Sequence, residues 1–80
     1  MWKVLVVDDD QGLRFSVREM LAQTSQFTIE EAFDGLNAVE KIKAAPFDLV
    51  ILDVDMPRLN GLEALKLIKE HDPSTIVIML

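Results

Sequence analysis

A short apolar run that ends in acidic residues constrains this chain more than any other feature. Leu49–Leu52 contains only Leu, Val and Ile, Asp53 follows it directly, and Asp55 and Pro57 come shortly after. A continuous run of this composition is typical of a strand that is buried on both faces, as in a parallel sheet. Asp53 is then expected at the carboxyl end of a strand, where open α/β sheets bind their ligands.

The same pattern occurs near the start of the chain. Val4–Val7 is an apolar, largely β-branched run, and Asp8, Asp9 and Asp10 follow it. We therefore predict a second buried strand with carboxylates at its carboxyl end. Asp10 also precedes an amphipathic segment, so we expect it to cap a helix there.

Helical spacing of apolar residues occurs in three segments, and two further β-leaning runs complete the pattern. In chain order, the expected elements are a strand at 4–7, a helix from Asp10 to the polar connector at 23–26, a strand at 27–32, a helix from the Asp34–Gly35 turn to about 45, a strand at 49–52, a helix from 62 to 71 and a strand at 75–80.

Strands that alternate with helices across short connections predict a parallel sheet with right-handed crossovers. The paired Glu30 and Glu31 make the second strand the most polar, so we place it at an edge. The strand order is then 2-1-3-4, which predicts a flavodoxin-like, doubly wound α/β fold. We expect one domain that spans residues 1–80. In this order the first and third strands are neighbours, and Asp8 and Asp9 lie beside Asp53.

Composition excludes several classes of function. The 80 residues include 14 acidic and 8 basic side chains, for a net charge of −6, which disfavours a nucleic-acid partner. There is no cysteine, so disulfides and thiolate chemistry are excluded, and a cytoplasmic location fits. No apolar stretch approaches the roughly 20 residues that a spanning helix needs, so we expect no membrane association.

Three carboxylates at one crevice call for a cation. Like charges about 4 Å apart repel by about 1 kcal/mol in water and by more in a partly buried site. Mg²⁺ suits a few carboxylates, a carbonyl and several waters, whereas zinc is disfavoured because the single histidine is the distant His71 and there is no cysteine. A cation beside Asp53 would also hold a phosphoryl oxygen, which indicates phosphoryl transfer to a carboxylate nucleophile.

Three separated motifs are similar to those of a known family. The segments Val6–Asp10, Ala32–Gly35 and Asp53–Pro57, the last followed by Asn60–Gly61, resemble the receiver domain of two-component response regulators, and the resemblance runs from residue 4 to residue 80. The chemotaxis member of that family is itself a known case of the 2-1-3-4 start of the flavodoxin-like order, so the order and the resemblance are not independent predictions.

The resemblance implies a role for each acidic residue. Asp53 is the phosphoacceptor, which takes its phosphoryl group from a sensor histidine kinase or a small phosphodonor. Asp9 binds Mg²⁺ (or Mn²⁺) directly, Asp8 acts at the same metal through water, and Asp55 contributes its backbone carbonyl. The chain is then a self-phosphorylating signalling domain and not an enzyme that turns over a substrate.

The resemblance also implies groups that are expected after Leu80, namely a Ser or Thr at the tip of the fourth strand and a Lys at the tip of a fifth. We therefore expect a truncated receiver domain with impaired switching. Thr75–Leu80 is then an exposed apolar edge strand, from which we predict a homodimer or larger assembly.

Two other interpretations stay open. Leu52–Asp55 is also similar to the nucleophile motif of haloacid-dehalogenase-type phosphatases, in which the second Asp is a general acid, although that family carries the motif on its first strand. Alternatively, the segment is a non-catalytic dimerising or folding module.

Several residues have simple structural interpretations. We assign Gly61 to a close approach or a helix start, and Arg14 and Arg18 to a solvated helix face. Arg14 is expected to lie close enough to the acidic cluster to interact with incoming anions. His71 is expected to be exposed at the carboxyl end of its helix.

Overall fold

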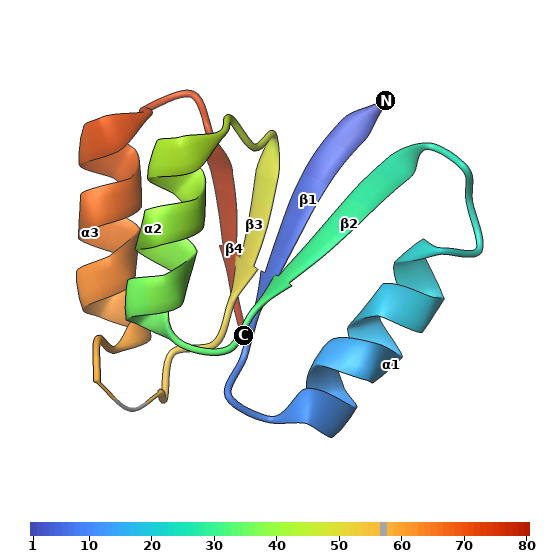
Figure 1. Cartoon of the computed structure of the whole chain (residues 1–80), viewed down its shortest axis with the longest axis horizontal. Coiled ribbons are helices and arrows are strands. Elements are labelled where there is room, and N and C mark those ends of the chain that lie inside the picture. The colour runs from blue at the N-terminus through green and yellow to red at the C-terminus, as the bar shows by residue number, and fades with distance from the viewer. Residues whose placement is uncertain (57) are drawn as a thin grey trace.

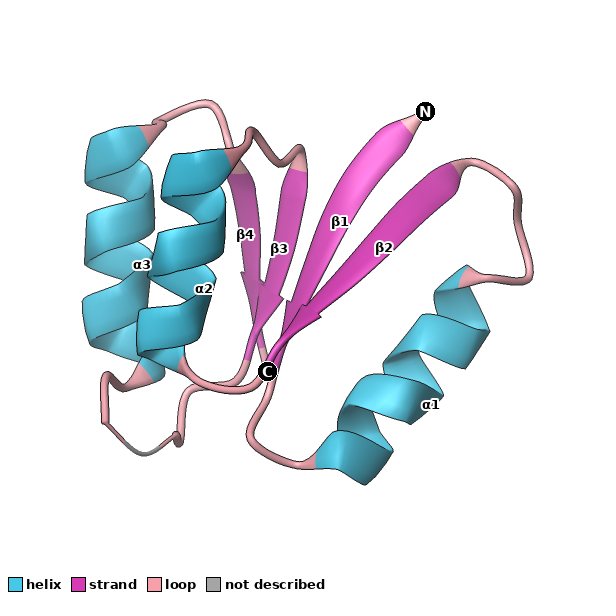
Figure 2. Cartoon of the chain, in the orientation of Figure 1, coloured by secondary structure: helices cyan, strands magenta, loops and turns pink. Residues whose placement is uncertain are grey.

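The computed structural model describes residues 1–56 and 58–80, so Pro57, which the sequence assigns to the loop after the third strand, lies outside the described part. Within these residues four parallel strands form one sheet, and three helices pack against it (Figures 1 and 2). The elements are β1 (Trp2–Val7), α1 (Gln11–Leu21), β2 (Phe27–Ala32), α2 (Gly35–Ala44), β3 (Leu49–Leu52), α3 (Gly61–His71) and β4 (Ile76–Met79).

The strand order is β2-β1-β3-β4, as predicted, and β1 pairs in parallel with both β2 and β3. The register places Val7 opposite Ala32 on one side and opposite Leu52 on the other, so the three strands end level with one another. The amide of Asp53 continues the ladder by donating to the Val7 carbonyl oxygen at 3.0 Å. Asp8 and Asp53 therefore leave the same edge of the sheet from adjacent strands.

The main hydrophobic core lies between the sheet and the pair α2 and α3, which run side by side over one face (Figure 1). Leu5 and Leu52 point into it from the strands, and Ile68 points into it from α3, all without solvent exposure. Burying a side chain of this size contributes about 1.5–3 kcal/mol each. This core holds β1 and β3 rigidly at the centre of the fold.

Helix α1 is less buried than its apolar spacing predicts. It packs against β1 and β2 on the other side of the sheet, and none of its residues is fully buried. Leu13 and Met20, which belong to the apolar spacing of this amphipathic helix, are 53% and 63% exposed. The apolar face is not fully buried because one helix beside the β2 edge covers only part of a sheet face. On β4, Ile76 and Ile78 are also about half exposed.

The polar edge strand β2 is held by ion pairs. Glu31 forms ion pairs with Arg14 at 3.0 Å and with Arg18 at 3.1 Å, and Glu30 forms one with Lys3 at 3.4 Å. Arg18 is exposed as predicted, but the Arg14 side chain is only 14% exposed, so its assignment to a solvated face was wrong. The guanidinium lies between α1 and β2, where its carboxylate partner and a main-chain oxygen replace water.

The helix starts follow the expected side-chain chemistry. Asp10 caps α1 by accepting the amides of Gly12 and Leu13, which confirms its predicted role. Asn60 caps α3 in a capping box with Glu63, so α3 begins at Gly61 and not after it. Within residues 1–56 and 58–80, no helix has the length and apolar character needed to cross a membrane.

Candidate functional site at the carboxyl edge of the sheet

Three carboxylates gather where β1 and β3 end. One oxygen from each of Asp8, Asp9 and Asp53 lies within 4.8 Å of the other two. The chain leaves β1 toward β2 on one side and returns to β3 on the other, so this gap is the topological switch point of the sheet. The structure thus brings together the three carboxylates that the sequence predicts to meet.

Two of these carboxylates are oriented by the backbone that follows them. The Asp10 amide donates to Oδ1 of Asp8 at 2.9 Å, and the Asp55 amide donates to Oδ1 of Asp53 at 3.1 Å. In each case an aspartate accepts from the amide two residues later, a local turn that this side chain favours. One oxygen of each carboxylate is thereby fixed, and the other is left for a ligand.

The cluster carries uncompensated negative charge. Asp8 is 8% exposed, and burial raises the pKa of its carboxyl group. The amide of Asp10 opposes that rise, while the neighbouring charges of Asp53 and Asp9 add to it. Among the ion pairs in the described residues, none neutralises any of these three carboxylates. A cation would therefore be strongly favoured here.

The donor set fits Mg²⁺. All three donors are carboxylate oxygens, the ligand type that this ion prefers, and adjacent ligands of an octahedral Mg²⁺ are about 3.0 Å apart while opposite ones are about 4.2 Å apart. The three oxygens lie within 4.8 Å of one another, so they can share one ion if the side chains move closer together or if one of them binds through water. The exposed position of Asp9 leaves room for such waters.

Asp55 differs from the other acidic residues of the site. Its side chain is exposed, and its carboxylate is not among the three that converge. Its contribution in the described geometry comes from its main chain, through the hydrogen bond to Asp53. That its backbone carbonyl binds the metal stays a prediction.

The sequence places Arg14 near the acidic cluster, but it does not predict the hydrogen bond that Arg14 makes there. Nη1 of Arg14 donates to the main-chain oxygen of Asp8 at 2.7 Å, and its Nε pairs with Glu31. Arg14 therefore ties the first turn of α1 to the end of β1. Its position one turn after the cap residue Asp10 indicates this proximity, but not these partners.

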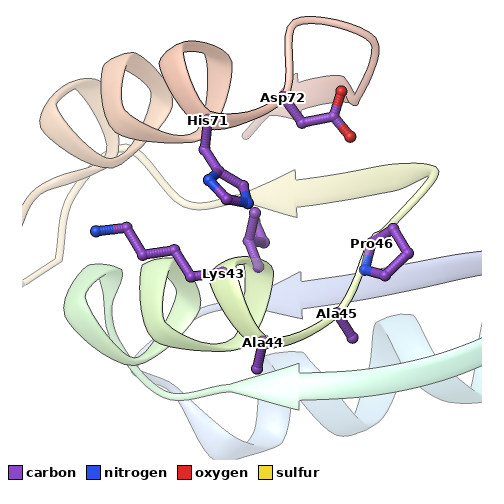
Figure 3. A pocket seen from close by; sticks show the side chains of 7 residues that line it. Lys43, Ala44, Ala45, Pro46, His71 and Asp72 are labelled. Atoms are coloured by element: carbon purple, nitrogen blue, oxygen red, sulfur yellow. The ribbon is translucent and has the colours of Figure 1, made fainter.

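A second hollow lies at the other end of the molecule, between the carboxyl ends of α2 and α3 (Figure 3). This cavity of about 230 Å³ is lined in part by Lys43, His71 and Asp72. His71 is exposed at the end of α3, as predicted. Lys43 and His71 lie in the last turns of their helices, where the helix dipole favours basic side chains, and this accounts for them without a ligand. The acidic cluster is thus the better candidate site.

Comparisons with known proteins agree with this geometry. The family described as "Response regulator receiver domain" matches residues 4–80. The chemotaxis protein CheY of Listeria monocytogenes is 40% identical over 79 residues, which cover 99% of this chain and 66% of that protein. A protein-glutamate methylesterase/protein-glutamine glutaminase of Lawsonia intracellularis is 39% identical over 80 residues, covering 99% of this chain and 22% of that protein.

Solved structures show the same likeness. The response regulator domain of Thermotoga maritima CheB superposes with a TM-score of 0.91 at 40% identity, over 99% of this chain and 59% of that one. CheY4 of Vibrio cholerae gives a TM-score of 0.91 at 36% identity, over 99% and 67%. The chain thus spans about two thirds of the length of these two CheY proteins. With its sheet order and with a family match over residues 4–80, this chain belongs to the response regulator receiver domain family.

Proposed function

We propose that Asp53 is the phosphoacceptor of this domain and that a sensor histidine kinase supplies the phosphoryl group. The observation that carries the proposal is the meeting of Asp53 with Asp8 and Asp9 at the switch point of the sheet. Family membership supports it, because phosphoacceptance is general among receiver domains. An absence of cysteine fits action in the cytoplasm, where such kinases present their phosphohistidine.

The proposed reaction needs little covalent work from the protein. A carboxylate oxygen of Asp53 attacks phosphorus as the phosphorus–nitrogen bond to the kinase histidine breaks, and the imidazole nitrogen keeps that electron pair. The product is an acyl phosphate on Asp53. Since the other oxygen of Asp53 is held by the Asp55 amide, the attacking oxygen is positioned in advance.

In this proposal Asp9 and Asp53 would hold Mg²⁺ through their carboxylates, Asp8 would act at the same ion through water, and Asp55 would add its backbone carbonyl. Mn²⁺ could take the same place. The ion would offset the negative charge that accumulates when phosphoryl oxygens approach the carboxylates. The raised pKa of Asp8 and the lack of an ion pair among the described residues support a cation at this position.

The test is phosphorylation by acetyl phosphate with Mg²⁺, followed by intact mass. We expect the mass of one phosphoryl group to be added, and Asp53→Asn to prevent it. Asp55→Asn separates the receiver from a dehalogenase-type phosphatase, because a receiver keeps its adduct whereas the phosphatase loses the general acid it needs. No adduct on the wild type in the presence of Mg²⁺ would favour the non-catalytic module and overturn the proposal.

We also propose that the domain self-associates through β4. This strand is an edge of the sheet, and Ile76 and Ile78 expose about half of their side chains there. A second copy is the fitting partner, because two identical edge strands related by a two-fold axis can pair with each other. Sedimentation velocity should show a dimer that Ile76→Lys with Ile78→Lys converts to monomer. A wild-type monomer at high concentration contradicts this part of the proposal.

A further inference from the structure

We propose that the ion pair between Asp34 and Arg58 is a positioning device for the metal site. It links the amino end of α2 to the β3–α3 loop, and that loop carries Asp53 and Asp55. The inference rests on the proposed function, and it assigns a role to two residues that lie outside the acidic cluster.

The pair is built on a fixed carboxylate. The side chain of Asp34 is 5% exposed, and Oδ1 accepts the amide of Asn37 at 2.8 Å as the cap of α2. Its other oxygen, Oδ2, receives Nη1 of Arg58 at 3.0 Å. Because the Asn37 amide holds one oxygen, the Asp34 carboxylate has a fixed position on α2 and does not move with Arg58. The ion pair therefore forms only when the loop brings Arg58 to this fixed position.

The backbone at Arg58 is strained. Its φ is 67°, and it is the one residue other than glycine with a positive φ among residues 1–56 and 58–80. This left-handed conformation is unfavourable for a residue that carries a Cβ. Such strain persists where surrounding contacts over-determine the conformation. The ion pair to the buried Asp34 is a contact of that kind.

Close packing at two glycines holds the loop on either side of Arg58. A Cβ on Gly35 would overlap the backbone of Leu59, whose carbonyl carbon would be 3.0 Å away. A Cβ on Gly61 would overlap the backbone around Asp53, with Cα of Val54 at 2.7 Å. The loop is thus pressed against α2 at one point and against the end of β3 at the other.

These contacts connect Arg58 to the predicted metal ligands. Arg58 follows Asp55 by three positions in the sequence, and the Gly61 amide donates to the Val54 carbonyl oxygen at 3.0 Å. If Arg58 were released, the strained backbone could relax, and the segment from Asp53 to Asp55 would lose one of the contacts that define its path. The metal-binding geometry would then be populated only part of the time, which lowers the apparent affinity.

The experiment is an NMR titration with Mg²⁺ that follows the amides of Asp53, Val54 and Asp55. Asp34→Asn is the sharpest variant, because asparagine keeps an oxygen that can cap α2 but removes the charge. We expect Asp34→Asn and Arg58→Gln each to weaken Mg²⁺ binding about tenfold, the loss typical of outer-shell partners of metal ligands. The double variant should be no weaker than either single variant, since both remove the same interaction.

Further variants separate positioning from general damage. Arg58→Lys should recover most of the affinity, and Lys41→Gln, which removes a cation from the remote pair with Glu30, should change nothing. In the metal-free protein, amide hydrogen exchange at Asp55 should speed up in Asp34→Asn and not in Lys41→Gln.

Three results are decisive against the inference. If the wild type binds Mg²⁺ and every variant binds it with an affinity within twofold of wild type, the inference fails while the proposed function stands. The same holds if the losses of affinity in the double variant are additive. A wild type that does not bind Mg²⁺ overturns the proposed function and this inference together.

Discussion

Asp8 and Asp53 come from different strands, yet their carboxylate oxygens lie within 4.8 Å of each other and Asp8 is buried. Burial raises the pKa of Asp8 first, and the charges of Asp53 and Asp9 raise it further. The folded protein therefore holds this proton more tightly than the unfolded chain. The stabilisation is fully present below the ordinary pKa of 3.8 and is lost as pH rises through the folded value.

The first prediction is that Asp8→Asn stabilises the metal-free protein at neutral pH. Removing a buried like charge should raise the free energy of unfolding by about 1 kcal/mol, or the melting temperature by about 4–8 °C for a domain of this size. Urea denaturation in the presence of a chelator measures it. The gain should disappear at a pH below 3.8, where the wild-type carboxyl is protonated. A variant that is less stable than wild type at neutral pH would contradict this.

The second prediction concerns the close approach at Gly61. Its added Cβ would overlap main-chain atoms of Asp53 and Val54, which cannot rotate away. Gly61→Ala should therefore lower the free energy of unfolding by about 1–3 kcal/mol, the usual cost of overpacking. Gly12→Ala is the matched control, because that Cβ meets only a side-chain oxygen of Asp10 at 3.2 Å. Equal losses in the two variants would refute the steric explanation.

The third prediction concerns the buried hydroxyl of Thr75. This residue is 1% exposed, and its Oγ1 donates to the Phe47 carbonyl oxygen at 3.1 Å, joining the start of β4 to the segment before β3. Thr75→Val keeps the shape but leaves that oxygen unpaired, so unfolding should become easier by about 1–3 kcal/mol. Thr75→Ser keeps the donor and should lose less. If chemical denaturation shows Thr75→Ser to be less stable than Thr75→Val, then packing, and not the hydrogen bond, determines the stability at this position.

The sequence predicts the position of the acidic cluster well, because that position depends on local sequence patterns. Val4–Val7 and Leu49–Leu52 each end in aspartate, and parallel strands end at a common edge. The polar Glu30 and Glu31 then suffice to place β2 at one side of the sheet. Strand type, strand order and the position of the acidic cluster therefore follow from patterns within a few residues, whereas the role of each aspartate at a metal is implied by the family resemblance.

The contacts that support the cluster depend on tertiary placement and do not follow from such patterns. Arg14 lies on a helix face that looks solvated until β2 brings Glu31 beside it. Arg58 pairs with Asp34 across two loops, 24 positions apart in the sequence. The exposure of Leu13 is a similar case, since helical spacing shows which face is apolar but not how much surface is available to cover it.

The last prediction is that Mg²⁺ stabilises the fold through the acidic cluster. An ion that binds only the folded state adds about 2.7 kcal/mol to the free energy of unfolding at a concentration one hundred times its dissociation constant. We expect Mg²⁺ to raise the melting temperature of the wild type and a chelator to reverse the rise. Asp9→Asn and Asp53→Asn should each remove most of the effect, because each takes away one charged ligand.

Asp48→Asn is the control for general electrostatics. Asp48 accepts the amide of Lys3 at 2.8 Å, and its place just before β3 puts it at the opposite edge of the sheet from Asp53. Its loss should leave the Mg²⁺ response unchanged, although it removes the same charge from the protein. If all three variants reduce the response equally, the ion acts on the net charge of −6 and not at a defined site.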